Sequence, residues 1–401
     1  MVEMRERVER ELRGDILPFW LKYALDDEYG GFRGQIANDL TIDPLAPKGL
    51  ILNARILWTF AKAYRVYREE VYLRTASRAY EYLQRHFWDQ EFGGVYWMVD
   101  YRGNPVDQKK RIYGQAFTVY ALAEYASASA EREPIEKAMA LHHLIEEASH
   151  DGTHGGYFET YERDWKLATE QRLSEVDMEE KKSMNTHLHM LEAYANLLRV
   201  WKDDGVRKRL GELLRIFLDH IIDPLTHHFR MFFDEQWRDR SKWISFGHDI
   251  EGSWLICEAA EVLGDQVILV EARKAAVSMA QAVWEQALDQ DGGLLYEGRG
   301  KEIIDTDKHW WPQAEAVVGF LNAYELSGKN YFLKASEKSW EFIENFIVDR
   351  QHGEWYWLVS RNGTPSNEKY KVDPWKCPYH NSRTCFEVME RLDMLAGKDR
   401  A

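Results

Sequence analysis

DQEFGGVYWMV, from Asp89 to Val99, is one of six similar stretches that together decide the fold. In each stretch an Asp is followed, three or four residues later, by Gly or His and then by an aromatic-rich extended segment. The other copies begin at Asp26, Asp151, Asp223, Asp289 and Asp349, so the copies follow one another at similar intervals along the whole chain. Six evenly spread copies indicate one repeated architecture, and we expect residues 1–401 to form a single domain.

The segments between the copies have the periodicity of helices. Residues 51–68, ILNARILWTFAKAYRVYR, and residues 71–87, VYLRTASRAYEYLQRHF, are one such pair. Each copy itself ends like a short strand and turn. Two helices and a hairpin, repeated six times, can close into a ring in which every unit buries its apolar face against its neighbours. The sequence therefore predicts an all-α fold, an (α/α)6 barrel with six short β-hairpins at one end.

The composition restricts the partners of the chain. It has 52 Lys and Arg against 67 Asp and Glu, and the resulting net charge of −15 disfavours nucleic acid and anionic membranes. Its three cysteines form neither an even-numbered disulfide framework nor a CxxC pair, and no apolar run approaches about 18 residues. We therefore expect a soluble, cytoplasmic protein, a monomer that binds neither nucleic acid nor membrane.

Polar and aromatic residues recur where the first helix after each hairpin begins. Because equivalent positions of a closed ring lie at the same end, we expect these side chains to face a common cavity. His187 and His189 are two residues apart and point about 200° apart on a helix, so only one can face it. His189 keeps Asn185 at i, i+4, and we assign His187 to packing. The candidate residues are Arg55, Asn185, His189, His248, Glu251, Trp311, Trp375 and His380, with Tyr113 and Asp177 each open between substrate contact and structure.

Five motifs carry a family resemblance that runs from about residue 12 to residue 395. The strings ILNARILWTFA, SMNTHLHMLEAYANL, SFGHDIE, DTDKHWWPQAEA and WKCPYHN resemble the cellobiose 2-epimerases of the N-acylglucosamine 2-epimerase superfamily. The resemblance implies an (α/α)6 barrel and reversible epimerisation at C2 of the reducing-end glucose of β-1,4-linked disaccharides. It implies that His248 and His380 are the catalytic histidines, and that Arg55, His189 and Glu251 match further site positions.

The residue types suit this chemistry. The C2 proton of an open-chain aldose is acidic because the charge left behind passes to oxygen as an enediolate, so no redox cofactor is needed. The chain contains no GxGxxG after a strand and no GxxxxGK[ST], and we expect neither cofactor nor metal. Inversion at C2 needs proton transfer on two opposite faces, which two histidines can perform near neutral pH.

We assign a role to each remaining candidate on the same basis. Arg55 stabilises the enediolate oxygen, and His189 moves the proton that opens the sugar ring. Glu251 orients His248 or a sugar hydroxyl, and Trp311 and Trp375 stack on the two sugar rings. Asn185, Tyr113 and Asp177 contact the substrate.

Several alternatives stay open at this point. Close relatives act on free mannose, as isomerases, or on N-acylglucosamine. A glycoside hydrolase would use two facing carboxylates, for which Glu251 with Asp177 or Glu315 are available. A metal-dependent sugar isomerase would use His189, His248, His380 and Glu251 as ligands, although no pair of them has the i, i+4 spacing usual for ligands on one helix.

Overall fold

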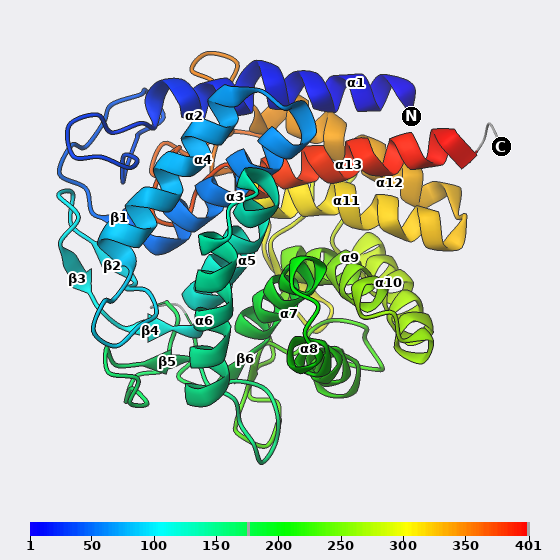
Figure 1. Cartoon of the computed structure of the whole chain (residues 1–401). Helices are drawn as coiled ribbons and strands as arrows, with labels where there is room; N and C mark the ends of the chain where they lie inside the picture. The colour runs from blue at the N-terminus through cyan, green and yellow to red at the C-terminus, as the bar shows by residue number, and fades with distance from the viewer. Residues whose placement is uncertain (175–176, 399–401) are drawn as a thin grey trace.

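The computed structural model describes residues 1–174 and 177–398, and its helices form an inner and an outer ring (Figure 1). The inner helices pack side by side in chain order around the centre, and the last returns to the first. They are α3 (Leu50–Tyr67), α5 (Ile112–Ser129), α7 (Met184–Val200), α9 (Phe246–Leu263), α11 (Trp310–Ser327) and α13 (Tyr379–Lys398). This arrangement is the (α/α)6 barrel that the six repeats predict.

One outer helix precedes each inner helix. Four of the outer helices continue through a short π-helical turn, at Leu12–Ile16, Leu83–Phe87, Phe217–Ile221 and Ile343–Ile347. The outer helices are α1 (Val2–Glu11) with α2 (Leu17–Tyr23), α4 (Glu70–Tyr82), α6 (Glu133–Ala148), α8 (Asp204–Ile216), α10 (Gln266–Gln286) and α12 (Asn330–Phe342).

The burial of the two rings explains their sequences. In α9 the buried residues lie on all sides of the helix, as expected for a helix enclosed by others. The outer helix α4 buries Tyr72, Ala76, Ala79 and Tyr80, which fall on one stripe at helical spacing. Among the described residues, no helix is both long and apolar enough to cross a membrane.

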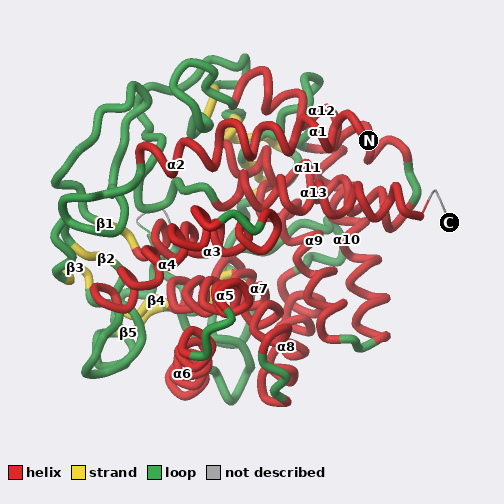
Figure 2. The backbone as a smooth tube through the Cα atoms, turned by 45° about the horizontal axis from the view of Figure 1, so that its top comes forward, coloured by secondary structure: helices red, strands yellow, loops and turns green. Residues whose placement is uncertain are grey.

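Short strands link each unit to the next at one end of the barrel. The strand that leads into an inner helix pairs antiparallel with the hairpin of the following unit. Figure 2 shows the strands and long loops on the side away from the two chain ends. The pairs are β1 (Lys48–Gly49) with β2 (Met98–Val99), β4 (Lys110–Arg111) with β5 (Thr160–Tyr161), β6 (Lys182–Ser183) with β7 (Phe232–Phe233), β8 (Ile244–Ser245) with β9 (Glu297–Arg299), and β11 (Lys308–His309) with β12 (Leu358–Val359).

Two hairpins carry an extra strand, and one bridge closes the ring. β3 (Pro105–Asp107) extends the sheet beyond β2, and β10 (Glu302–Asp305) pairs with β9. Ile36, in the first hairpin, bridges Val372, which precedes the last inner helix. The sixth unit is thereby joined to the first in the same way as the others are joined.

In five of the six units a buried lysine joins the hairpin to the inner helix of the same unit. Lys182 lies two residues before α7, and Asp151 is the first residue of the hairpin in the same unit. The distance from Lys182 Nζ to Asp151 Oδ2 is 2.8 Å. Burial alone would raise the pKa of Asp151, but Lys182 and two backbone amides lower it to about 2. The matching pairs in the other units are Lys48–Asp26, Lys110–Asp89, Lys308–Asp289 and Lys371–Asp349.

The fourth unit uses a different polar contact. Ile244 occupies the position of the lysine, and the imidazole of His228 lies 2.7 Å from the Asp249 carboxylate instead. Asp249 also accepts a hydrogen bond from the amide of Phe229, at 2.7 Å. The junction between hairpin and inner helix is therefore held by buried charge or polar groups in all six units.

The fourth residue of an inner helix binds the backbone of the hairpin. Gln115 and Gln313 each pair with both the amide and the carbonyl of one hairpin residue, Val95 and Leu294 respectively. His187 has the same place in α7: its Nε2 accepts from the Tyr157 amide at 2.9 Å, and its Nδ1 lies 2.7 Å from the Ser183 carbonyl. His187 therefore serves the fold.

Lys182→Met tests the importance of the buried lysines. Removing one partner of a buried ion pair leaves the other charge uncompensated, and we expect the free energy of unfolding to fall by about 3–5 kcal/mol in a urea titration. Lys166→Met, which breaks an exposed pair with Asp164, should leave stability almost unchanged. If Lys182→Met were as stable as the unaltered protein, the lysine would not be needed to hold the hairpin.

Candidate active site

A cavity of about 380 Å³ lies where the inner helices begin. All six inner helices, or the segments that lead into them, contribute side chains to its wall. The structure brings all ten residues predicted from the sequence to this one cavity: Arg55, Tyr113, Asp177, Asn185, His189, His248, Glu251, Trp311, Trp375 and His380.

Seven other residues of the wall were not predicted from the sequence. Three of them, Tyr296, Trp357 and Trp310, are aromatic. An alignment of the repeats with one another would have identified Tyr296 and Trp357, because they occupy equivalent positions. Tyr296 and Trp357 both stand just before the hairpin strand, and each carbonyl accepts the amide of the first residue of an inner helix. The remaining four are Leu173, Ser174, His309 and Lys369.

His248 is held by a hydroxyl group and an aromatic ring. Its Nδ1 lies 2.7 Å from Ser245 Oγ, and its ring centre is 4.7 Å from that of Trp311. Burial away from water, with repulsion from His189 and Arg55, lowers the pKa of His248 to about 3. The imidazole is therefore neutral at physiological pH and available as a base.

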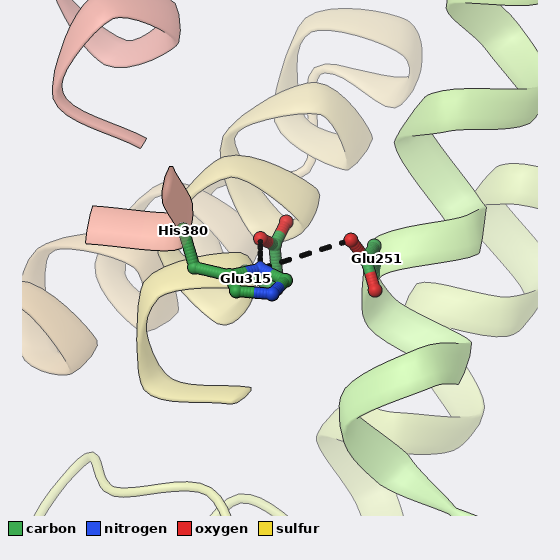
Figure 3. Close-up of side chains that lie close together, drawn as sticks. All are labelled: Glu251, Glu315 and His380. Carbon is green, nitrogen blue, oxygen red and sulfur yellow. Dashed lines mark hydrogen bonds and ion pairs between the residues drawn. The ribbon is translucent and has the colours of Figure 1, made fainter. Parts of the chain in front are cut away.

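His380 is oriented by a carboxylate (Figure 3). Its Nδ1 is 2.7 Å from Glu315 Oε1, and the ring centre of Trp311 lies 5.6 Å from its own. Burial, together with the positive charges of Arg55 and Arg383, holds the pKa of His380 well below its usual range. With Nδ1 donating to Glu315, the lone pair of the neutral ring is on Nε2. Trp311 therefore contacts both imidazoles, His248 and His380.

Arg55 supplies a fixed positive charge to the cavity. Its Nη2 donates to the Tyr113 hydroxyl at 3.0 Å, and the guanidinium lies over the rings of Phe117 and Tyr379. The residue is only 3% exposed, so little water screens it. A developing negative charge on a ligand oxygen would be stabilised strongly here.

His189 has a carboxylate partner of its own. Its Nδ1 is 3.0 Å from Glu192 Oε2, and its ring packs edge-on to Tyr113. Burial alone would raise the pKa of Glu192, but Arg383 and His189 lower it to about 2. Glu192 is thus an ionised acceptor behind the wall of the cavity.

Glu251 binds Arg383 and not His248. Its Oε1 accepts from Arg383 Nη2 at 2.5 Å and lies 3.8 Å from His380 Nδ1. Burial and the nearby Glu315 carboxylate raise the pKa of Glu251 to about 7. The glutamate therefore exchanges its proton near neutral pH, close to His380 instead of the histidine one turn away on its own helix.

Glu251, Glu315 and His380 offer ligand atoms within 4.8 Å of one another, a geometry compatible with a metal ion (Figure 3). The guanidinium of Arg383 stands among them, because its Nη2 donates to both glutamates, at 2.5 and 2.6 Å. The same two oxygens that would bind a cation already bind this one. The donor set fits an internal ion pair better than a metal centre.

Aromatic side chains cover the rest of the wall. Trp375 packs edge-on to Trp97 and Tyr113, and the ring centres of Trp310 and Trp357 are 4.7 Å apart. Tyr296 and His309 stack in parallel, with ring centres 3.8 Å apart. Flat apolar faces beside polar hydrogen-bonding groups suit a ligand with C–H faces and many hydroxyls. The cavity can thus hold a sugar and transfer protons to and from it.

The titration of His248 tests its environment. We expect its ring to remain neutral on acidification until the pH approaches about 3, observed as an unshifted NMR signal assigned with His248→Asn. An unfolded histidine titrates near 6.5, so below that pH the unfolded chain binds the proton more tightly. The free energy of unfolding should therefore fall as the pH drops from about 6.5 to about 3, less steeply in His248→Asn. A His248 signal that titrates near 6.5 would contradict this environment.

Comparisons with known proteins place the chain among sugar epimerases. The family described as N-acylglucosamine 2-epimerase matches residues 30–382. The chain is 44% identical to the cellobiose 2-epimerase of Bacteroides fragilis, over 96% of this chain and 98% of that protein. It is 40% identical to the cellobiose 2-epimerase of Dictyoglomus turgidum, over 97% and 99% of the two chains. The solved structure of cellobiose 2-epimerase from Bacillus thermoamylovorans B4167 superposes with a TM-score of 0.93 at 40% identity, covering 98% of this chain and all of the other.

Proposed function

The chain belongs to the N-acylglucosamine 2-epimerase family, and from this membership we propose that it epimerises disaccharides at C2 of the reducing-end glucose. The substrates are β-1,4-linked sugars such as cellobiose and lactose, and the product carries mannose at that end. The observation that carries the proposal is the pair of neutral imidazoles, His248 and His380, on one sugar-sized cavity. The near full-length similarity to cellobiose 2-epimerases supports the disaccharide as substrate.

The two histidines exchange the C2 proton from opposite faces of the open-chain sugar. One imidazole removes the C2 proton, and the electrons pass to the C1 carbonyl oxygen as an enediolate. The other imidazole takes up a proton at its free nitrogen, from protonated Glu251 or from solvent, and delivers it to C2 from the far side; the first imidazolium then releases the proton that it took from C2. Each becomes positive only while the enediolate is negative, and this opposite charge raises its pKa at that moment. The reaction is reversible, so either histidine serves as base in one direction.

Arg55 and His189 complete the reaction. The guanidinium of Arg55 stabilises the enediolate oxygen in a site with little water. His189, whose Nδ1 is tied to Glu192, has its Nε2 free to move a proton between O5 and O1 and so open the sugar ring. Glu251 exchanges protons with a sugar hydroxyl or with His380. Trp311 and Trp375 stack on the sugar rings, and Asn185, Tyr113 and Asp177 bind hydroxyl groups.

A glycoside hydrolase fits the site less well. Such an enzyme needs two carboxyl groups separated by about 5 Å or more across the scissile bond. Glu251 and Glu315 instead share the Nη2 of one arginine, so they cannot flank a sugar. Asp177 is bound by the amide and hydroxyl of Ser174, and burial raises its pKa.

We propose that the whole chain acts as one catalytic unit and as a monomer, because every inner helix of a single chain contributes to the wall of the cavity. A cytoplasmic location is supported by the three cysteines, Cys257, Cys377 and Cys385, all of which are buried free thiols. No residue of the proposed reaction requires a bound cofactor.

Incubation with separate sugars tests the function. With a chelator present and no nucleotide added, cellobiose and lactose should each give the 2-epimer with its glycosidic bond intact, as measured by chromatography. Free mannose and N-acetylglucosamine, in parallel tubes, should react far more slowly. Release of monosaccharides would favour a hydrolase, and a strict requirement for added metal or nicotinamide would refute the proposal.

Replacement of each histidine in deuterated water tests the proton pair. His248→Asn and His380→Asn should both abolish net epimerisation, each with a loss of at least about 10²-fold, the lower end for a general acid–base group. One variant should still exchange the C2 hydrogen of the glucose form, and the other that of the mannose form. His143→Asn is the control for a histidine outside the cavity, because His143 is exposed on the outer helix α6. Near wild-type epimerisation by either cavity variant would show that the reaction uses a single base.

A further inference from the structure

One arginine joins three glutamates behind the cavity. Arg383 lies on α13, and its side chain is 1% exposed. Its Nη1 binds Glu192 and its Nη2 binds Glu251 and Glu315, at 2.5 and 2.6 Å. The glutamates come from α7, α9 and α11, so the guanidinium connects four of the six inner helices. It is further enclosed by the faces of Trp254 and Tyr379, at 4.8 and 4.4 Å.

Two of the glutamates accept hydrogen bonds on both oxygens. Glu192 binds Arg383 and Tyr379 on Oε1 and His189 on Oε2. A carboxylate whose other partners are donors of this kind is held in its ionised form. It can then only accept from His189, so Nδ1 of that imidazole carries a hydrogen.

Glu315 repeats this arrangement for His380. Its Oε1 accepts from Arg383 and from His380 Nδ1, and its Oε2 accepts from Trp254 Nε1 at 3.0 Å. Each of the two histidines thus binds a glutamate of its own, and both glutamates bind the guanidinium of Arg383. Both histidines therefore carry a hydrogen on Nδ1, and in the neutral ring of His380 the lone pair is left on Nε2.

The third glutamate has a free oxygen. Arg383 binds only Oε1 of Glu251, and the residue borders the cavity. Three carboxylates around one guanidinium carry an excess of negative charge, and the excess is relieved most easily by protonation at Glu251. Arg383 therefore decides which glutamates remain ionised.

We propose that Arg383 is a positioning residue that sets the Nδ1–H tautomer of both His189 and His380, by holding Glu192 and Glu315 ionised and in place. The roles of the two histidines in catalysis rest on the proposed function, whereas their tautomers do not. The ring-opening group and one proton-transfer group would thus be prepared by a single buried charge.

Loss of the guanidinium should reverse the hydrogen bond at His380. Burial already raises the pKa of Glu315, and Arg383 is the strongest influence that opposes it. Without that charge Glu315 takes up a proton and can donate to Nδ1, which moves the hydrogen of the neutral ring to Nε2. The nitrogen that faces the substrate can then no longer accept a proton. The charged and titratable groups that surround Arg383 and His380 are Arg55 on α3, Tyr120 on α5, His189 and Glu192 on α7, His248 and Glu251 on α9, Glu315 on α11 and Tyr379 on α13.

Histidine-selective ¹⁵N NMR measures the tautomers directly. In the unaltered protein His189 and His380 should both show a protonated Nδ1 and an unprotonated Nε2. In Arg383→Gln at least the His380 signals should change to the opposite tautomer or to a mixture. Glu315→Gln should change His380 alone, and Glu192→Gln should change His189 alone, so the test survives if Arg383→Gln does not fold. Unchanged tautomers in the folded variants would overturn the proposal.

Activity provides a second readout. For Arg383→Gln we expect kcat to fall at least about tenfold and KM to change little. Activity is lost when Glu315 takes up a proton. Because loss of the Arg383 charge raises the pKa of Glu315, the acid limb of the kcat–pH profile should move to higher pH in Arg383→Gln. Arg383→Lys keeps the charge. It should therefore show a smaller fall in kcat and a smaller shift of the acid limb than Arg383→Gln.

Arg391→Gln is the matched control, because Arg391 is on the same helix and binds Glu325 at 2.5 Å, but it does not border the cavity. It should keep the wild-type profile and tautomers. An equal change in Arg391→Gln would show a general loss of packing and would overturn the proposal. If the unaltered protein did not epimerise disaccharides, the proposed function would fail while the NMR test of Arg383 remained decisive.

Discussion

The buried ion pair between hairpin and inner helix, a lysine–aspartate pair in five units and His228 with Asp249 in the fourth, is the contact on which the site depends. It fixes the hairpin to the helix of its own unit, while the strand beside it pairs with the hairpin of the next unit. A displaced hairpin would move the first turn of the helix, where the residues of the cavity are found. Since these charges lie away from water, each pair is held with little freedom, and the cavity inherits that rigidity.

The inner helices direct neighbouring polar groups to two different places. The fourth residue of α5 and of α7, Gln115 and His187, reaches the hairpin. Asn185 in the first turn and His189 in the second turn of α7 reach the cavity. Burying so many polar atoms would be costly if they lacked partners, and Arg383 supplies one to each of three glutamates. The order needed for proton transfer is thereby obtained from hydrogen bonds inside the wall, before any ligand binds.

The repeats made much of the fold predictable from the sequence. Hairpins at similar intervals lead to a six-unit ring, and the ring brings Arg55 and His380 together although they lie near opposite ends of the chain. The partners of those residues were harder to foresee, because they depend on side-chain direction. Glu251 is one helical turn from His248, which suggested a pair, yet its carboxylate turns toward Arg383 and His380. Arg383 itself gave no signal, since it lies beyond the recognised motif, in a helix where an arginine could equally well face solvent.

The closing bridge between Ile36 and Val372 means that no unit occupies an end position. In an open array of helix pairs the outermost repeat has only one neighbour and frays first. Here every repeat has two, and the contact between α1 and α13 covers the place where the chain itself begins and ends its circuit. Local opening of one repeat would expose the flanks of both neighbours at once. The barrel should therefore lose its structure in one cooperative step, with amide exchange protection shared around the circle instead of decreasing toward either terminus.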